Sequence, residues 1–591
     1  MSPDEKKQPE YGSDLIVDCL RKYGIEYISA NIGSTFRGLW DSLVNYGDDV
    51  SPKTIAVCHE EIAVAIAHGY AKASGKPMAA ILHDTVGLQH ATMAIYNAWC
   101  DRVPIILLGA SGPMDPVKRR PWIDWIHTSM IPNDAVRDYV KWDDLALSIE
   151  SFLESFARGY NLAVTGPSAP VFISLDSECL ERKLDGAKSI SEMPAIPSFP
   201  APSDDSLQRI VDLLLDSNNP YIVAGTVGRN PQSVGSLVKI AETVGARVLD
   251  TLDRFNFPNT NPLDVSDKMD LAEADFILAL DALKLEFSLS KINKSTRESR
   301  LITRSDVRIA RVGLEDLLTK GWAADYQGLV SSELSILADT SNALPRLAEL
   351  CSRAVEKAGP SMKNKILERK ERARTRHRKQ RDRWVEEAKR QWDDVPVSLP
   401  RLALEAWELV KGSDWVIANG SLEGWARRLW DWNVPGCFLG DSGGAGLGYG
   451  LPASIGAALA LKNHRDGKKK LVIDFQADGD FLFVPSALWT AAHYQVPVLI
   501  LMFNNRLYYN DAEHNKLVAE ARARDSRRAY DVGGRITEPS VDFAKLAGSY
   551  GVYGRGPIEK PDEIRGAIEA ALNVVEAEGK PALVDIVTKA R

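Results

Sequence analysis

Residues 476–505 read QADGDFLFVPSALWTAAHYQVPVLILMFNN, and this stretch decides the fold. Apolar runs at 469–476 and 496–503 each predict a strand, and the segment between them, 484–494, predicts a helix. A strand, a crossover helix and a second strand form a βαβ unit, whose two strands are parallel. Asp478 follows the first strand and Asn505 the second. We therefore expect both side chains at the same edge of one sheet, where ligands bind in such folds.

The residue types at this edge predict a metal–phosphate site. A carboxylate and a carboxamide oxygen form a hard ligand set that suits Mg²⁺, which completes its coordination with phosphate and water. Gly479 allows the backbone to come close to a phosphate. An Asx turn would explain Asp478 or Asn505 alone. The pair, one after each strand of a single crossover, favours the metal site.

The whole chain repeats the strand–helix alternation, which predicts an α/β protein with three doubly wound parallel-sheet domains in series. The expected strands of the first domain are 26–33, 77–84, 103–110 and 169–176, those of the second are 220–225, 246–250 and 274–280, and those of the third are 414–420, 469–476, 496–503 and 581–588. The expected domains are an N-terminal one at 10–190, a central one at 203–355 and a C-terminal one at 396–591. A Pro/Ser-rich linker at 191–205 separates the first two, and a charged linker helix at 356–395 precedes the third.

Composition narrows the class of protein. The net charge of −8 argues against a nucleic-acid partner, and the charged segment 363–392 interleaves acidic with basic residues, as a solvated connecting helix does. No apolar run approaches the roughly 18 residues that span a bilayer. The N-terminus lacks an apolar signal region, and the 6 cysteines are scattered without a CxxC pair. These features predict a cytoplasmic enzyme with reduced thiols and no membrane or nucleic-acid partner.

The segment ADGDF at 477–481, followed by the asparagine pair at 504–505, resembles the cofactor motif of thiamine-diphosphate-dependent enzymes. This superfamily includes acetolactate synthase, pyruvate oxidase and benzoylformate decarboxylase. The resemblance implies a thiamine-diphosphate-binding fold in which Asp478, the side-chain oxygen of Asn505 and the backbone carbonyl of Leu507 hold Mg²⁺. The metal in turn holds the diphosphate. Ala477 departs from the family pattern, which usually has a glycine there.

A second resemblance lies at 58–77, CHEEIAVAIAHGYAKASGKP, which is similar to the family's HE…GYAR.SGKP segment. It implies that Glu60 is the catalytic carboxylate. Thiamine chemistry uses the cofactor's aminopyrimidine as a base, and a Glu hydrogen-bonded to the pyrimidine ring favours the required tautomer. An acidic pair that begins a helix also stabilises the helix dipole, which explains Glu61 and would suffice for Glu60 alone.

Glycine-rich segments supply the remaining cofactor contacts that the resemblance implies. In GDSGGAGLGYGLPASIGAALA, at 440–460, the carbonyl of Ala445 and the amide of Leu447 would meet the pyrimidine, and Leu447 would hold the cofactor in its bent shape. The expected cofactor-binding residues are Asn419, Gly420, Ser421, Ala445, Leu447, Gly479, Asp480 and Phe481.

Pocket residues follow from the same resemblance. Ser34 and Asn510 are expected to line the substrate pocket, and His83, His127 and Asp511 are candidate acids or bases, with His127 on a loop. A structural role explains each histidine equally well. The turn containing Asn510 and Asp511 is expected to lie over the thiazolium ring.

The implied function is cleavage or formation of a C–C bond next to a carbonyl, by a lyase or transferase with thiamine diphosphate and Mg²⁺. A 2-oxo acid decarboxylase or carboligase, acetolactate synthase-like, is the first expectation. A cyclic 1,2-dione or acyloin C–C hydrolase or lyase, or a flavin-containing oxidase, is the alternative. Residues 278–291 lack the Gly-Arg signature of the acetolactate synthase flavin site, so we favour an enzyme without FAD and leave FAD open.

The family also implies self-association into a homodimer or homotetramer, with Glu60 of one subunit serving the metal site of its partner. Two other classes fit less well. A protein that has lost catalysis would lack Glu60 or the pair Asp478 and Asn505. A nucleotide-dependent dehydrogenase would carry GxGxxG after its first strand, and NIGSTFRG at 31–38 does not supply it.

Overall fold

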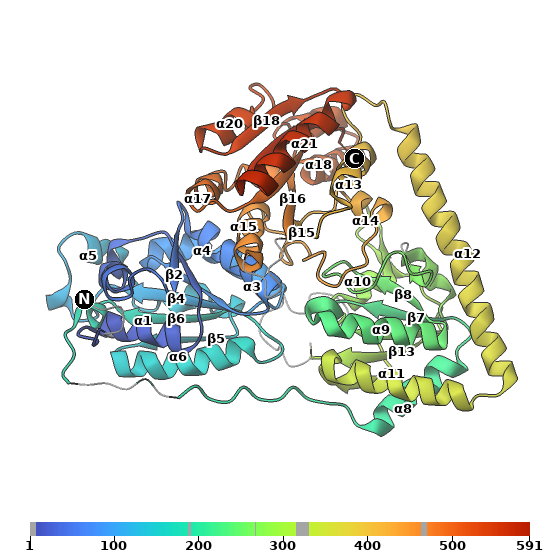
Figure 1. Ribbon diagram of the computed structural model, residues 1–591, viewed down its shortest axis with the longest axis horizontal. Coiled ribbons are helices and arrows are strands. Elements are labelled where there is room, and N and C mark those ends of the chain that lie inside the picture. Colours follow the sequence, from blue (N-terminus) through green and yellow to red (C-terminus); the bar gives the residue numbers. More distant parts are fainter. Residues whose placement is uncertain are drawn as a thin grey trace.

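Three parallel sheets with helices on their faces follow one another along the chain (Figure 1). The computed structural model describes residues 7–186, 190, 192–265, 268–314, 330–462 and 470–590. The predicted α/β fold with parallel sheets is confirmed. Ser191, the first residue of the expected Pro/Ser-rich linker, and Lys469, the first of an expected strand, lie outside the described residues.

The N-terminal sheet has the strand order β2-β1-β3-β4-β6-β5, and every pairing in it is parallel. Its strands are β1 Tyr27–Ala30, β2 Lys53–Ala56, β3 Met78–Leu82, β4 Ile105–Ser111, β5 Trp142–Ala146 and β6 Val171–Asp176. Its main helices are α1 Gly12–Lys22, α3 Glu60–Ser74, α4 Asp84–Cys100 and α6 Ile149–Val164. Strand β3 is completely buried, as expected for a strand covered on both faces.

The central sheet has the order β14-β13-β10-β7-β8-β9. Its strands are β7 Pro220–Ala224, β8 Arg247–Asp250, β9 Asp264–Val265, β10 Phe276–Leu280, β13 Arg308–Gly313 and β14 Leu334–Leu337. Helices α8 Asp204–Asp216, α9 Pro231–Val244 and α11 Thr340–Lys357 cover it. A separate antiparallel pair, β11 Ser290–Ile292 and β12 Ser299–Leu301, lies outside this sheet.

The C-terminal sheet has the order β15-β16-β17-β19-β18, and its β16 and β17 are the two strands of the stretch 476–505. Its strands are β15 Trp415–Asn419, β16 Leu471–Ala477, β17 Val498–Asn504, β18 Tyr553–Ile558 and β19 Ala582–Val587. Its helices include α13 Leu399–Val410, α14 Trp425–Leu429, α15 Gly450–Leu461, α17 Ala487–His493, α18 Tyr509–Ala521, α20 Phe543–Ser549 and α21 Ile564–Asn573. The helix predicted at 484–494 is therefore shorter than expected.

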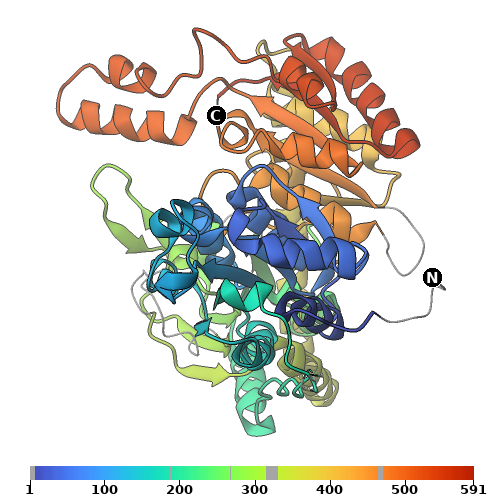
Figure 2. The same cartoon turned by 90° about the vertical axis from the view of Figure 1, so that its left-hand side faces the viewer.

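The first and third domains share one hydrophobic core, which includes residues of α3, β3, α15 and β17. Helices α3 and α15 meet backbone to backbone: a Cβ at Gly69 would lie 1.9 Å from the carbonyl oxygen of Ala453, and one at Gly456 would lie 1.9 Å from that of Ile66. Only glycine permits such a close approach. In Figure 1, α3 and α15 lie next to each other, and Figure 2 shows the blue N-terminal segments lying against the orange C-terminal ones.

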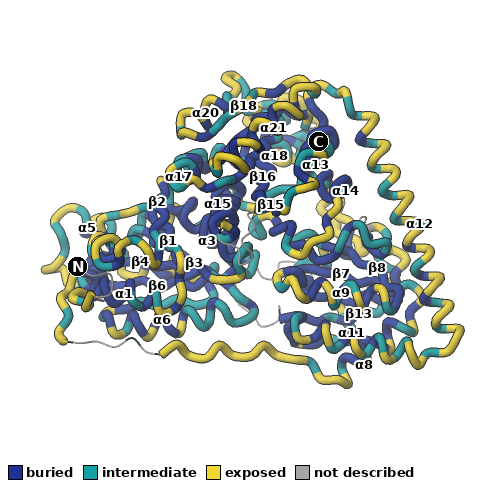
Figure 3. Tube along the Cα trace, in the orientation of Figure 1, coloured by how far each residue is buried: buried dark blue, intermediate teal, exposed yellow. Residues whose placement is uncertain are grey.

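Helix α12, Pro360–Arg390, runs along one side of the molecule from the central to the C-terminal domain (Figure 1). Its residues are mostly exposed or half-buried (Figure 3), and its few buried positions are Ile366, Arg369, Ala373 and Ala388. This is the helix expected within 356–395. Among the described residues, no helix combines the length and the apolar character that a membrane span requires.

Candidate active site

Asp478 and Asn505 lie together at the carboxyl ends of β16 and β17. The strands pair in parallel with Ala477 opposite Phe503, so that the residues following each strand meet. Asp478 is 1% exposed and begins the one-turn helix α16, Asp478–Phe481. The Oδ2 atom of Asp478 and the Oδ1 atom of Asn505 are both buried, and neither has a hydrogen-bond partner among the described residues. Two unsatisfied buried oxygens side by side fit a bound cation.

The carboxyl of Asp478 is costly to bury in charged form. Burial raises its pKa to about 6, although the backbone amides of Gly479, Arg506 and Leu507 partly offset this effect. A divalent cation would compensate the buried charge. Asn504 points elsewhere: its amide nitrogen donates to Asp585 at 2.9 Å, and its side-chain oxygen accepts from the amide of Arg506 at 3.1 Å. The two asparagines are therefore unequal, and Asn505 is the one that faces the site.

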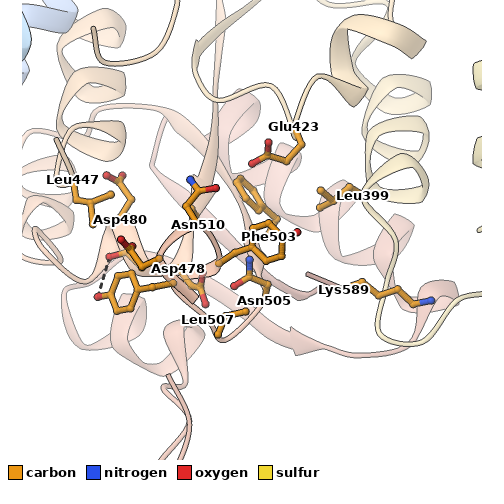
Figure 4. A pocket seen from close by; sticks show the side chains of 15 residues that line it. Leu399, Glu423, Leu447, Asp478, Asp480, Phe503, Asn505, Leu507, Asn510 and Lys589 are labelled. Atoms are coloured by element: carbon orange, nitrogen blue, oxygen red, sulfur yellow. Dashed lines mark hydrogen bonds between the residues drawn. The ribbon is translucent and has the colours of Figure 1, made fainter. Parts of the chain in front are cut away.

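A cavity of about 150 Å³ opens at this point (Figure 4). Its lining combines the predicted metal-binding residues with aromatic side chains and two loops. The lining residues are Leu399, Glu423, Leu447, Ala477, Asp478, Gly479, Asp480, Phe503, Asn505, Leu507, Tyr508, Tyr509, Asn510, Asp511 and Lys589. The carbonyl oxygen of Leu507 accepts one bond, from the amide of Tyr509 at 2.9 Å. Ala477 has a φ of −80°, which any residue adopts, so a glycine is not required there.

A second cavity of about 360 Å³ adjoins the first and shares five of its lining residues, Glu423, Leu447, Ala477, Asp480 and Phe503. It is also lined by the predicted residues Asn419, Gly420, Ser421 and Ala445. The two cavities form one groove along the strand ends, which we call the cofactor groove. Phe481 differs from the other predicted residues. It is 0% exposed and packs against Phe543 with ring centroids 5.6 Å apart, so it belongs to the core.

The loop at 440–449 is held by hydrogen bonds from both the C-terminal and the N-terminal domain. Ala445 and Gly448 have φ values of 53° and 90°, which turn the chain sharply. Asp480 accepts hydrogen bonds from the amides of Gly448 at 2.8 Å and Gly450 at 3.3 Å. Asn97 of α4 forms a reciprocal pair with the backbone of Gly446, at 3.2 and 3.1 Å. The segment between Ala445 and Leu447 is therefore fixed by the N-terminal domain as well.

Glu60 lies in a different place, at the first position of α3. It is 4% exposed, accepts a hydrogen bond from Asn31 Nδ2 at 3.1 Å, and has His90 Nδ1 3.3 Å from its other oxygen. A Cβ at Gly87 would lie 2.8 Å from its Oε1 atom. Asn31, Gly87 and His90 were not predicted from the sequence, because they lie far from Glu60 along the chain: Asn31 follows β1, and Gly87 and His90 belong to α4.

His83, His127 and Ser34 gather beside Glu60. The rings of His83 and His127 meet edge to face with centroids 5.4 Å apart, and the Nδ1 atom of each is buried without a described partner. Burial, followed by the proximity of His127, lowers the pKa of His83. Arg120 donates to the carbonyl oxygen of Ser34 at 3.2 Å. These residues form an N-terminal cluster, and none of them lines either cavity of the cofactor groove.

Two of the expected local conformations were wrong. Asn510 and Asp511 lie in the first turn of α18 and not on a short turn, and both are exposed while lining the 150 Å³ cavity. His127 ends the short helix α5, Ile123–His127, where a loop was expected. Helix α5 is only about one turn long, which is too short to give a periodic pattern in the sequence. Asp511 is in the first turn of α18, where the helix dipole stabilises an acidic residue.

Asp84 is a buried acid that the sequence did not single out. It is 1% exposed, has a left-handed φ of 43°, and takes hydrogen bonds from Thr35 Oγ1 and the Thr85 amide. Burial raises its pKa to about 6, an effect that the amides of Thr85 and Gly112 oppose. It therefore joins the segments that carry Ser34 and His83. Its position directly after the histidine of ILHD, at a strand end, is the signal that could have found it.

Replacement of Asp84 by Asn should change how stability depends on pH. The folded pKa, about 6, lies above the usual value near 3.9, so folding favours the neutral acid. That stabilisation is complete below about pH 4 and is lost as the pH rises through 6. Asn stays neutral and tolerates a positive φ. We expect the variant to gain about 2 kcal/mol on the wild type between pH 4 and pH 8, measured as a Tm difference of a few degrees by calorimetry.

Asp185→Asn, at an exposed position of the same domain, is the control and should show no such trend. A Tm difference for Asp84→Asn that stays constant across this pH range would contradict the buried-acid interpretation.

The described part of the central sheet is closely packed at the carboxyl ends of β7 and β10. In this sheet the strand order reverses between β7 and β10, which is where doubly wound folds bind nucleotides. There the amide of Gly225 donates to the carbonyl of Leu280 at 2.9 Å, and a Cβ at Gly225 would lie 1.9 Å from the carbonyl oxygen of Asp281. Asn256, 0% exposed, fills the adjacent space and donates to the carbonyl of Gly225 at 2.6 Å.

A cavity at this edge, lined in part by Thr226 and Asp281, has a volume of about 50 Å³. Cofactor pockets usually occupy roughly 300–1,000 Å³. The cavity lined by Thr226 and Asp281 is smaller than this range.

Two family models and several curated proteins match this chain. The family model described as "Thiamine pyrophosphate enzyme, N-terminal TPP binding domain" matches residues 11–131, and the corresponding C-terminal TPP binding domain matches residues 418–586. The chain is 25% identical to the "Probable acetolactate synthase large subunit" of Methanocaldococcus jannaschii, over 98% of this chain and 91% of that protein. It is 23% identical to benzoylformate decarboxylase of Pseudomonas aeruginosa, over 97% and 98%.

Among solved structures, the fold is similar to the thiamine diphosphate-dependent 4-hydroxybenzoylformate decarboxylase of Rhodococcus jostii. The TM-score is 0.74 at 18% identity, with 98% of this chain and 99% of that chain covered. The benzoylformate decarboxylase of Polynucleobacter necessarius gives a TM-score of 0.73 at 18% identity, over 98% and 99%.

Proposed function

Because this chain belongs to the superfamily of thiamine-diphosphate-dependent enzymes, we propose that it cleaves or forms a carbon–carbon bond next to the carbonyl group of a small substrate. The observation that carries this proposal is the pair of unsatisfied buried oxygens, Asp478 Oδ2 and Asn505 Oδ1, at the floor of the cofactor groove. In this proposal they hold Mg²⁺ together with the carbonyl oxygen of Leu507. Oxygen ligands and an open side toward a phosphate suit that ion.

The rest of the groove then holds the organic cofactor. Asn419, Gly420 and Ser421 lie at the end of β15, where they would contact the diphosphate, and Ala445 and Leu447 would contact the pyrimidine. When bound, thiamine diphosphate supplies a nucleophilic ring carbon together with a base of its own. Asn97 and Asp480 keep the 440–449 segment in a fixed conformation for that ligand, because each bonds directly to its backbone.

Glu60 would hold and release a proton at a nitrogen of the pyrimidine. Its carboxyl is almost completely buried, and Asn31 and His90 fix both of its oxygens. A carboxyl held in one orientation and shielded from water is suited to a single short hydrogen bond. His83 and His127, whose Nδ1 atoms lack described partners, would exchange protons with the substrate.

We propose 2-oxo acids as the substrate class, with decarboxylation or carboligation as the reaction. Two observations support this. The relatives named acetolactate synthase and benzoylformate decarboxylase align with nearly the whole chain. The pair of close histidines, His83 and His127, offers proton donors for the reaction. The second candidate is hydrolysis or lysis of a cyclic 1,2-dione or acyloin, since water activated by the same histidines would serve that reaction. A flavin-containing oxidase finds no support in the closed central crevice.

We also propose that the complete active site forms between two copies of the chain, as a dimer or a dimer of dimers. The cofactor groove is lined by residues from the C-terminal third, whereas Glu60, His83 and His127 form a separate cluster in the N-terminal domain. A second copy would place its own N-terminal cluster over this groove. Exposed apolar side chains beside the cluster, Trp122, Trp125 and Ile126, support a contact there, since they are 65–77% exposed.

A substrate screen tests the proposed function. The purified protein, saturated with thiamine diphosphate and Mg²⁺, is incubated with pyruvate, benzoylformate, acetoin, diacetyl and cyclohexane-1,2-dione, and products are identified by mass spectrometry. Release of CO₂ from a 2-oxo acid, at a rate that falls when Mg²⁺ is chelated, is the expected result. Ring opening of the dione without CO₂ would assign the second candidate. Flavin absorbance in the purified protein would contradict the interpretation of the central domain.

A further inference from the structure

Helix α12 carries a row of basic side chains on the face that lies against the central domain. Arg369, Arg372, Arg376, Lys379 and Arg383 follow one another at intervals of three or four residues, which places them on one side of a helix. The row runs along the amino ends of the central strands, because Pro220 and Arg247, which begin β7 and β8, line the same depressions as Arg369 and Arg376. This is the edge opposite the crevice between β7 and β10.

The first half of the row has a structural explanation. Arg369 is 3% exposed and donates to the carbonyl oxygens of Val244 at 2.8 Å and Leu215 at 3.1 Å, which lie in the last turns of α9 and α8. Arg372 reaches the side chain of Asn219 at 3.3 Å. These contacts attach α12 to the central domain and stabilise the two helix ends.

The second half of the row borders an open cavity of about 490 Å³, which we call the α12 cavity. It is far larger than the space beside Arg369 and falls within the range of small-molecule sites. It is lined mainly by polar side chains from α12 and from the starts of β8, β9 and the segment after β9. The lining residues are Arg247, Asp264, Asp270, Arg376, His377, Lys379, Gln380 and Arg383.

The carboxylates of the α12 cavity are both engaged with arginines. Asp264 accepts two bonds from Arg427, at 2.6 and 3.2 Å, and Asp270 is paired with Arg247. Both carboxylates are therefore already paired, and among the described residues neither forms an ion pair with a basic side chain of α12.

The cations on α12 are left in excess. Arg376 is paired with Glu273 at 2.6 Å, but Lys379 and Arg383 have no carboxylate partner within the part of the chain that the structure describes. Arg383 bonds only to the neutral side chain of Gln380. The Nε–H of Arg247, on the opposite wall, is buried and has no described hydrogen-bond partner. The cavity therefore holds two uncompensated positive charges and an unused donor.

We propose that the α12 cavity binds a phosphate-bearing small molecule. A guanidinium and an ammonium group that share a concave site match the charge and the several acceptor oxygens of a phosphate. A charge row on an exposed helix is more often simply solvated. That explanation covers Arg374 and Arg378, which are exposed and do not line the α12 cavity, and Arg374 is also paired with Glu371 at 3.2 Å. It does not account for a cavity of this size lined by cations in excess of their partners.

The site also borders the C-terminal domain. Arg427, the partner of Asp264, belongs to α14. His377 bonds to the carbonyl oxygen of Asn259, and the side chain of Asn259 donates to the carbonyl oxygen of Trp430 at 2.9 Å. Helix α14 follows the segment 419–424 of the cofactor groove. Occupation of the α12 cavity would act on residues directly attached to that segment.

The experiment uses the full-length protein saturated with thiamine diphosphate and Mg²⁺, so that the cofactor groove does not compete for the probe. Fructose 1,6-bisphosphate is titrated into the protein by calorimetry, with fructose as the uncharged comparison. We expect binding of the bisphosphate and none of fructose. The double variant Lys379→Ala/Arg383→Ala should weaken binding at least about tenfold, since it removes both charge-assisted contacts that α12 would make to the phosphate groups.

The matched control is Arg374→Ala/Arg378→Ala, which removes two cations from the opposite face of the same helix. It should bind the probe as the wild type does, and a melting curve confirms that both variants are folded. Absence of binding to the wild type overturns the proposal, and so does equal weakening in the two double variants. The result does not depend on the proposed reaction, because it measures binding alone.

Discussion

Glu60→Gln is expected to lower turnover by about a thousandfold while thiamine diphosphate still binds, because acid–base catalysis by one positioned side chain contributes about 10²–10⁴-fold. Gln has nearly the same shape as Glu, so it can keep the contact with Asn31, which now lies 3.1 Å from Glu60. It cannot exchange a proton with the pyrimidine. The expected loss is therefore in kcat, with little change in KM.

The measurement is steady-state kinetics with the substrate found in the screen, together with cofactor affinity from calorimetry. Glu61→Gln is the matched control. Glu61 begins the same helix, but its carboxylate lies near Gly448 of the C-terminal domain, and burial followed by the proximity of Asp480 raises its pKa to about 7. This control should retain most of its turnover. Wild-type turnover in Glu60→Gln would refute the assigned role.

Asp478→Ala is expected to lower the Mg²⁺-dependent affinity for thiamine diphosphate by about a hundredfold or more, which corresponds to about 3 kcal/mol. The variant removes one of the two unsatisfied buried oxygens and leaves Asn505 alone at the floor of the groove. Burial of the charged carboxyl is unfavourable, since its pKa is raised to about 6, so the protein without cofactor should be at least as stable as the wild type. Loss of binding would then not reflect unfolding.

Calorimetric titration of thiamine diphosphate, with and without Mg²⁺, provides the measurement. Asp562→Ala changes an exposed acid of the same domain and should bind the cofactor normally. An affinity of Asp478→Ala equal to that of the wild type, with the same dependence on Mg²⁺, would exclude Asp478 as a metal ligand.

The sequence predicted the parts of the site that depend on regular structure. Asp478 and Asn505 follow two parallel neighbouring strands, and a βαβ crossover brings such positions together without any knowledge of the remaining fold. Their adjacency was therefore predictable, and the pairing of Ala477 with Phe503 confirms it. The parallel sheets were predictable for the same reason.

Contacts between distant segments were not predictable in this way. Asn31, Gly87 and His90 surround Glu60, and Asn97 fixes Gly446, yet no local pattern marks any of them. They depend on how helices and loops pack in three dimensions. Phe481 shows the opposite problem: it lies within a cofactor motif, but its side chain turns into the core because successive residues of a one-turn helix face different directions.

The backbone contacts of α3 with α15, Gly69 against Ala453 and Gly456 against Ile66, have a consequence for the integrity of the polypeptide. The outer thirds of the chain bury one continuous apolar surface between them. The middle third packs against the last through a second core that includes Val234 and Phe255, and it is connected along the chain by the exposed stretch at 192–203 and by α12. A protease that cuts at those two places would sever the polypeptide but leave its ends associated. The first and last domains thus pack together although they are not neighbours along the chain. Both must be synthesised completely before the apolar surface that they share is buried.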